Sequence, residues 1–241
     1  GHKKSLLTSW VMLELAKQGR VAVASMEMPP AVTLKRMASM VFARTSQFSD
    51  YLQFEKWYGE KICVYDQLDM VPAERILGFI NYCATELKCR HIFIDSLTKL
   101  GIAKDDMNSE KVLVDRLQWA AKTLDVGIHL VCHMRKPADE KHPRMPTRYT
   151  IRGAGEISDL ADNVFICHCD KQKDDVAEKD ARGAHLTEQE IEIMKKPDLY
   201  LRIDKQRNAT WEGTIALWHR NNQFKAHDTG EIFRFDHVTG K

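Results

Sequence analysis

The sequence lacks any stretch that could cross a membrane or direct the chain out of the cell. Its apolar runs fall short of the roughly 18 residues that a spanning helix needs, and no signal peptide opens it. It also lacks an excess of charge of one sign, because 36 Lys and Arg stand against 34 Asp and Glu. The composition therefore predicts a cytoplasmic protein without a membrane partner. Any nucleic-acid surface must come from a local cluster of cations.

Paired Cys-x-x-Cys knuckles, typical of zinc sites, are missing as well. The cysteines lie in apolar or strand-like surroundings, which predicts reduced thiols; they are Cys63, Cys83, Cys89, Cys132, Cys167 and Cys169. The run Cys167-His168-Cys169 suggests a metal site at first sight. Alternation along a strand, however, sends the two thiols to one face and the imidazole to the other, so we expect no metal there.

Helix-like and strand-like segments alternate over the first 133 residues. Leu6, Trp10 and Leu13, for example, recur at helical spacing before Gly19. The predicted helices are 6–19, 30–45, 72–88 and 113–124, and the predicted strands are 21–26, 62–65, 91–95 and 126–132, with a polar helical patch before the second strand. This alternation predicts an α/β fold in which a mainly parallel sheet is flanked by helices. At this length we expect one domain over residues 1–241.

The character of the chain changes after residue 133. Residues 135–152 form a loop rich in proline and basic residues, and a strand is predicted at 163–169. A charged stretch without apolar periodicity follows at 170–198, which we expect to be an exposed and partly mobile excursion. Antiparallel strands are predicted at 200–203, 214–218, around Phe224 and at 232–233.

Polar residues follow three of the predicted parallel strands. Glu27, Asp95 and His133 stand at their carboxyl ends, where open α/β sheets place their ligands. Each residue also has an ordinary structural interpretation: Asp95 could cap a strand end, Glu27 could complement a helix dipole, and a lone histidine is more often structural. We expect the three side chains to gather at one edge of the sheet.

The first residues match the second half of a phosphate-binding P-loop, G-x-x-x-x-G-K-[ST]. Lys4 and Ser5 occupy its last two positions and lead directly into a helix. In a full P-loop, backbone N–H groups and the lysine bind phosphates, and the hydroxyl binds Mg²⁺. Lys3 replaces the preceding glycine. Because only glycine freely takes a positive φ, we expect the Lys3 side chain to crowd the phosphates or to change the turn.

The loop after His133 holds the local basic cluster that the balanced composition conceals. Two acidic residues stand against six bases, which are Arg135, Lys136, Lys141, Arg144, Arg148 and Arg152. Flexible cations of this kind neutralise backbone phosphates without reading bases. The alternative interpretation is a solvated basic loop.

Five short motifs, in order, resemble those of the hexameric replicative DNA helicases, the DnaB-type proteins and bacteriophage primase-helicases. They are Ser25-Met26-Glu27-Met28, His91-Ile92-Phe93-Ile94-Asp95-Ser96, Val131-Cys132-His133-Met134-Arg135, Ile151-Arg152-Gly153-Ala154-Gly155 and Lys205-Gln206-Arg207-Asn208. The resemblance implies a RecA-like P-loop NTPase core with C-terminal antiparallel strands. It spans nearly the whole chain, and its specificity lies in the order and spacing of the motifs.

The resemblance also implies roles for individual residues. Glu27 corresponds to the catalytic base, Asp95 to the Walker B acid and His133 to the γ-phosphate sensor. Lys4 and Ser5 bind ATP or another NTP, and Ser5 and Asp95 hold Mg²⁺. Arg207 is the arginine finger that reaches a neighbouring subunit, with Lys205 beside it. Arg152, Gly153 and, less directly, Lys136 and Lys141 contact single-stranded DNA. If the family resemblance is set aside, an equally good interpretation is that Lys205 and Arg207 are ordinary cations of an edge strand.

By this resemblance the chain is the motor of an ATP-dependent replicative DNA helicase, which translocates on single-stranded DNA and separates the duplex. The implied partners are single-stranded DNA, identical subunits in a hexameric ring and a primase domain or protein, in the cytoplasm of a bacterial host if a phage encodes the chain. Two alternatives remain: a RecA-like DNA-dependent ATPase without helicase activity, and a DNA-binding or assembly module that has lost nucleotide binding, as Lys3 suggests.

Overall fold

The strands in the described part of the chain form two sheets of four. A computed structural model describes residues 3–102, 106–135, 145–152, 156–169 and 171–226. The first sheet is parallel, in the order β2-β1-β3-β4, and consists of β1 (Arg20–Ser25), β2 (Ile62–Tyr65), β3 (Cys89–Asp95) and β4 (Gly127–Val131). The second is antiparallel, in the order β5-β6-β7-β8, and consists of β5 (Asn163–His168), β6 (Leu199–Gln206), β7 (Gly213–Arg220) and β8 (Gln223–Ala226). The predicted α/β fold with C-terminal antiparallel strands is therefore confirmed.

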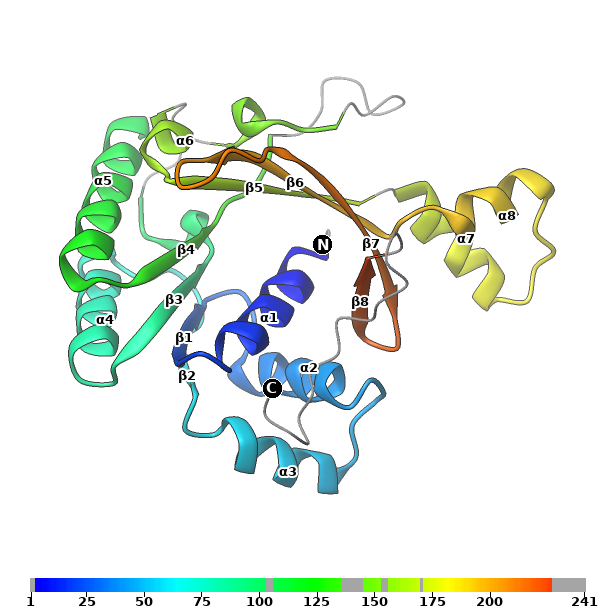
Figure 1. Ribbon diagram of the computed structural model, residues 1–241, viewed down its shortest axis with the longest axis horizontal. Helices are drawn as coiled ribbons and strands as arrows, with labels where there is room; N and C mark the ends of the chain where they lie inside the picture. The colour runs from blue at the N-terminus through cyan, green and yellow to red at the C-terminus, as the bar shows by residue number, and fades with distance from the viewer. Residues whose placement is uncertain (1–2, 103–105, 136–144, 153–155, 170, 227–241) are drawn as a thin grey trace.

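Helices cover both faces of the parallel sheet (Figure 1). The α-helices are α1 (Lys4–Leu15), α2 (Pro30–Val41), α3 (Phe48–Tyr58), α4 (Ala73–Thr85), α5 (Met107–Leu124), α6 (Glu156–Leu160), α7 (Lys171–Ala181) and α8 (Glu188–Lys195), and two short 3₁₀ helices are η1 (Leu97–Lys99) and η2 (Arg148–Thr150). One buried cluster joins α4 and α5 to the sheet through residues such as Ile80, Leu117 and Ile94. The other joins α1 and α2 to the opposite face through Leu13, Met37 and Val23.

Helix α1 packs between the parallel sheet and the antiparallel one, as Figure 1 shows. Trp10 meets Phe224 of β8 edge to face, with ring centroids 6.0 Å apart, a geometry that aromatic pairs favour. The side-chain amide of Gln223 donates to the Met40 carbonyl of α2 at 2.9 Å. These contacts attach α1 and α2 to β8 of the antiparallel sheet.

The register of the parallel strands aligns their carboxyl ends. Ser25 of β1 lies opposite Asp95 of β3, and Asp95 lies opposite Val131 of β4. Since parallel strands run in one direction, the residues that follow them emerge at one edge of the sheet. The sequence predicted this edge from the polar residues that end each apolar run.

The charged stretch 170–198, expected to be an exposed and partly mobile excursion, contains two helices that the sequence analysis did not predict. Helices α7 and α8 form there and project from the body of the protein (Figure 1). They form without a wide apolar stripe because local polar contacts support them. Thr187 and Glu190 make a capping box at the start of α8, and Lys179 of α7 pairs with Glu190 at 2.7 Å.

Other element boundaries differ slightly from the predictions. Helix α2 ends at Val41, before the predicted residue 45, and Ala43 then takes a left-handed φ of 55°. The predicted strand 232–233 lies outside the described residues. No helix within the described part of the chain combines the length and apolarity needed to cross a bilayer.

A buried ion pair attaches α7 to the antiparallel sheet. The side chain of Lys173 is 3% exposed, and its ammonium lies 3.1 Å from Asp198, which immediately precedes β6. Asp198 also accepts from the backbone N–H of His219 at 2.9 Å and from Arg220 at 3.0 Å. The Asp198 carboxylate therefore compensates a charge that has almost no access to water.

We expect Asp198→Asn to lower the free energy of unfolding by about 3–5 kcal/mol, because it leaves the buried Lys173 ammonium without its counter-charge. Urea unfolding followed by circular dichroism measures the change. Asp175→Asn, at an exposed position of α7, is the matched control. Adding Lys173→Met to Asp198→Asn should recover much of the loss. An Asp198→Asn protein as stable as the wild type would contradict this account.

Candidate functional site

The polar residues that follow β1, β3 and β4 converge with the first turn of α1. Asp95 is the last residue of β3, whereas Glu27 and His133 each lie two residues beyond their strands. Lys4 and Ser5 begin α1. The structure thus brings together all five residues that the sequence assigned to the nucleotide site.

Ser5 and Asp95 form the most buried part of this cluster. The Ser5 hydroxyl donates to Oδ2 of Asp95 at 3.2 Å, and Asp95 is only 7% exposed. Burial raises the pKa of Asp95, and the charge of Glu27 raises it further; the Ser5 hydrogen bond and the charge of Lys4 oppose these effects. Ser5 and Lys4 therefore favour the ionised form of this carboxylate.

The Lys4 ammonium lies against the end of β4. Its Nζ donates to the Cys132 carbonyl at 3.2 Å and lies 3.0 Å from Nδ1 of His133. Both partners belong to the segment that leaves the sheet toward the basic loop. Lys4 therefore connects the start of α1 with that segment.

Ser96 links Glu27 and His133, a role that the sequence analysis missed. Its hydroxyl donates to Oε1 of Glu27 at 2.8 Å and lies 3.2 Å from Nε2 of His133. His133 Nε2 is itself 3.2 Å from the same Glu27 oxygen. The Thr98 hydroxyl is a further neighbour of Ser96, at 2.8 Å. The only available signal was the position of Ser96 directly after Asp95.

The carboxylate of Glu27 is held in its charged form. Partial burial by itself would raise the pKa of Glu27, but the hydrogen bonds with Ser96 and His133, together with the charge of Lys4, outweigh it and hold the pKa below its usual value. The side chain is 39% exposed. Glu27 is therefore an ionised and accessible acceptor beside the buried Asp95.

Lys3 does not crowd the start of α1, contrary to the expectation from sequence. The residue adopts the left-handed backbone that a glycine would supply, with φ of 46° and ψ of 7°. Its side chain points away from the cluster, with Nζ 2.9 Å from Asp174 of α7 and 4.0 Å from Asp198. Lys3 itself thus takes a conformation open to glycine, and its ammonium is compensated by Asp174.

The donors in this cluster suit a magnesium-bound nucleoside triphosphate. No capping side-chain hydrogen bond forms at the N-cap Lys3, and the first turn of α1 contains no acidic residue, so its N–H groups can face an anion. The Lys4 ammonium adds a charge for phosphate. The Ser5 hydroxyl and the Asp95 carboxylate supply the oxygen ligands that Mg²⁺ prefers.

The two ends of the basic loop are paired directly beside His133. The backbone N–H of Arg152 donates to the His133 carbonyl at 2.8 Å, and that of Arg135 donates to the Thr150 carbonyl at 2.8 Å. Met134 and Ile151 form an antiparallel bridge between them. We call residues 133–135 with 150–152 the neck of the loop. The Arg152 side chain is exposed, whereas Lys136, Lys141 and Gly153 lie outside the described residues.

Lys205 and Arg207 share one face, as alternation predicts, but they lie apart from the cluster. Lys205 donates to the carbonyls of Ser158 and Asp159 at 2.9 and 2.8 Å. Arg207 donates to the same Asp159 carbonyl at 3.0 Å and pairs with Asp162 at 2.9 Å. Among the described contacts, neither cation bonds to a residue of the cluster. Both are anchored at α6, and the Arg207 side chain is 46% exposed.

One buried cation lies near the site. The buried Nη1 of Arg36 in α2 finds no hydrogen-bond partner among the described residues, and its guanidinium lies within range of the Asp95 charge.

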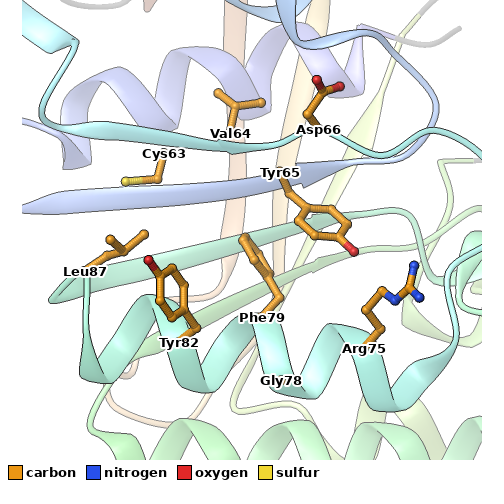
Figure 2. A pocket seen from close by; sticks show the side chains of 9 residues that line it. All are labelled: Cys63, Val64, Tyr65, Asp66, Arg75, Gly78, Phe79, Tyr82 and Leu87. Carbon is orange, nitrogen blue, oxygen red and sulfur yellow. The ribbon is translucent and has the colours of Figure 1, made fainter.

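An apolar groove of about 550 Å³ lies between β2 and α4. Figure 2 shows Tyr82 and Phe79 among the side chains that line it. No residue of the cluster lines this groove. The two thiols of the Cys167-His168-Cys169 run lie together, because Cys167 packs against the buried core cluster that contains Cys169.

Comparisons with known proteins agree with this arrangement. The family model of the DnaB-like helicase C-terminal domain matches residues 3–227. A DNA helicase/primase of Enterobacteria phage T3 is 26% identical over 133 residues, which are 51% of this chain and 24% of that protein. The chain thus spans less than two thirds of this curated relative.

Solved structures share the fold. A DnaB-like replicative helicase, solved with a view to its interactions with primase, superposes with a TM-score of 0.65 at 18% identity, covering 92% of this chain and 54% of that one. A second solved structure, an ATPase domain, gives a TM-score of 0.62 at 18% identity and covers 92% of this chain and 81% of its own. At these identities the structures establish the fold, which is that of helicase ATPase domains.

Proposed function

Since the chain belongs to the family of the DnaB-like helicase C-terminal domain, we propose that it is the motor of a replicative DNA helicase. It hydrolyses a nucleoside triphosphate, with ATP the expected substrate, and couples hydrolysis to movement on single-stranded DNA and to duplex unwinding. The observation that carries the proposal is the convergence of five residues at one sheet edge: Lys4, Ser5, Glu27, Asp95 and His133.

The start of α1 and the end of β3 hold the nucleotide in this proposal. Lys4 binds the β and γ phosphates, and the N–H groups of the first turn bind their oxygens. Ser5 and Asp95, 3.2 Å apart, hold Mg²⁺, which when bound neutralises charge that develops on the phosphates. The positive charges of the ion and of Lys4 both favour the ionised form of Asp95.

Glu27 orients the attacking water. Its pKa lies below the usual value, so at neutral pH the carboxylate is a good hydrogen-bond acceptor but a weak base. This suits phosphoryl transfer, where positioning and charge stabilisation supply most of the rate. Ser96 and His133 fix the carboxylate in place through their contacts with Oε1.

His133 transmits the state of the phosphates to the DNA-binding loop. Its Nδ1 faces Lys4 and its Nε2 faces Glu27, and its carbonyl accepts from Arg152 in the neck. A movement of His133 therefore moves the residue that we assign to DNA contact. Arg152, together with Lys136, Lys141 and Gly153 of the loop, binds the backbone phosphates of single-stranded DNA.

The complete site requires a second subunit. Arg207 is exposed and anchored at α6, away from its own cluster, so in this proposal it reaches the nucleotide of a neighbour, with Lys205 beside it. A homohexameric ring meets this requirement. A primase domain or partner belongs to the proposal as well, since the phage T3 relative is a helicase/primase and the DnaB-like helicase was solved for its interactions with primase.

The test is to measure nucleotide affinity, hydrolysis with and without single-stranded DNA, and unwinding of a forked duplex with the full-length protein. We expect DNA-stimulated hydrolysis and unwinding. Stimulated hydrolysis without unwinding would favour a DNA-dependent ATPase of another kind. Failure to bind nucleotide would favour the assembly module and would contradict the role of Lys4.

Arg152→Ala should weaken single-stranded DNA binding while leaving DNA-free hydrolysis unchanged. Loss of one phosphate contact should lower the slope of log affinity against log salt by about one, whatever the DNA sequence. Fluorescence anisotropy over a salt series measures this slope. Arg182→Ala, which removes an exposed cation directly after α7, is the control. Unchanged affinity at low salt would argue against the neck as a DNA-binding element.

A further inference from the structure

One aromatic ring stands in the open beside the neck. Tyr149, the central residue of η2, is 73% exposed, although tyrosine usually buries much of its ring. It lies three residues before Arg152, whose side chain is also exposed. An exposed ring among cations is the combination by which proteins hold single-stranded nucleic acids, with rings stacking on bases and cations on phosphates.

The ring of Tyr149 is held in place by its neighbour. The guanidinium carbon of Arg148 lies 5.2 Å from the ring centroid, and Nη2 of Arg148 donates to the tyrosine hydroxyl at 3.1 Å. The backbone N–H of Arg148 donates to Oδ2 of Asp204 at 2.7 Å, and its Nη1 donates to the Asp204 carbonyl at 3.2 Å. Arg148 is thus tied to the antiparallel sheet and in turn orients the ring.

Asp204 makes this attachment rigid. It is 8% exposed, and its other carboxylate oxygen lies 2.6 Å from Nε of Arg202 on the same strand. A ring that the fold has already oriented loses little conformational freedom when a ligand arrives. Because the Arg148 guanidinium already donates to the Asp204 carbonyl and the Tyr149 hydroxyl, the exposed Arg152 is the better candidate for a phosphate contact.

We propose that Tyr149 stacks on a base of the single-stranded DNA whose backbone Arg152 contacts. This rests on the proposed function and adds to it a contact with the bases, which the charge of the loop alone does not provide. A purely electrostatic loop binds any polyanion of sufficient charge density. With Tyr149 in place, the loop prefers a strand that carries bases but tolerates any sequence, because every base has a flat face.

The experiment compares oligo-dT with an abasic strand of equal length in fluorescence anisotropy, using the assembled full-length protein. Tyr149→Ala should weaken oligo-dT binding about 5- to 150-fold, the range for loss of one base–aromatic stack, without weakening abasic binding. Tyr149→Phe should keep most of the affinity. Tyr82→Ala, at another exposed tyrosine on α4 (54% exposed), is the matched control.

The outcomes separate this inference from the proposal on which it rests. If the wild-type protein binds both strands equally and Tyr149→Ala changes neither, DNA binding stands and stacking is overturned. An equal loss for both strands would assign Tyr149 a structural role and also overturn it. If the wild type binds neither strand, the proposed function fails and takes this inference with it. A DNA strand with 5-iododeoxyuridine should cross-link to the peptide containing Tyr149; cross-links confined to other peptides would contradict stacking.

Discussion

Arg207→Ala is expected to lower kcat for nucleotide hydrolysis by about 10³- to 10⁵-fold in the assembled oligomer, the range for loss of an arginine finger. Nucleotide affinity should change little, because Arg207 bonds to Asp162 and Asp159 and not to the residues that we propose to bind phosphate in its own subunit. Single-turnover hydrolysis and equilibrium nucleotide binding measure the two effects. Arg182→Ala should behave as wild type.

Mixing two inactive variants tests whether Arg207 acts on a neighbouring subunit. Glu27→Gln subunits retain Arg207, and Arg207→Ala subunits retain Glu27. If the finger crosses the interface, a mixed ring contains some sites with both residues intact, and activity should reappear. A finger that acted within its own subunit would give no recovery on mixing. Hydrolysis retained at the wild-type rate by Arg207→Ala alone would remove the finger role altogether.

Glu27→Gln is expected to lower kcat by about 10²- to 10⁴-fold while nucleotide binding is retained. The glutamine keeps the shape and an acceptor oxygen for Ser96, but it removes the negative charge that orients the water. Hydrogen bonds hold the pKa of Glu27 below its usual value. Protonation of Glu27 should therefore reduce the wild-type rate only when the pH drops below that lowered pKa.

The controls for Glu27→Gln address folding and charge. Glu55→Gln removes the same charge from an exposed position of α3 and should leave the rate unchanged. Steady-state kinetics over a pH series, with unfolding curves for each variant, give the measurement. A Glu27→Gln enzyme that turns over at the wild-type rate would show that the water is oriented by another group.

The position of the cluster followed from the sequence because two simple rules determine it. Apolar runs such as 91–95 are recognisable by composition, and helices between them require parallel crossovers. Parallel strands in aligned register bring Asp95 and the residues after β1 and β4 to one edge. The polar residue at or just after the end of each apolar run was then enough to propose the site.

Contacts between side chains distant in sequence could not be predicted in this way. The pairing of Lys3 with Asp174 joins residues 171 positions apart, and no local pattern indicates it. Ser96 was overlooked because serine is common and only its three neighbours in space give it importance. Helices α7 and α8 were missed because capping and ion pairs, and not an apolar stripe, support them.

The contact between Lys4 and His133 fixes the tautomer of the histidine. An ammonium carries hydrogens but no lone pair, so Nδ1 of His133, 3.0 Å from Lys4 Nζ, must accept and carries no hydrogen. The neutral ring then bears its hydrogen on Nε2, where it faces the Glu27 oxygen at 3.2 Å. A phosphate that draws Lys4 away exposes the lone pair of Nδ1. In the proposed function, arrival of the nucleotide therefore releases this contact and leaves the imidazole free to reorient.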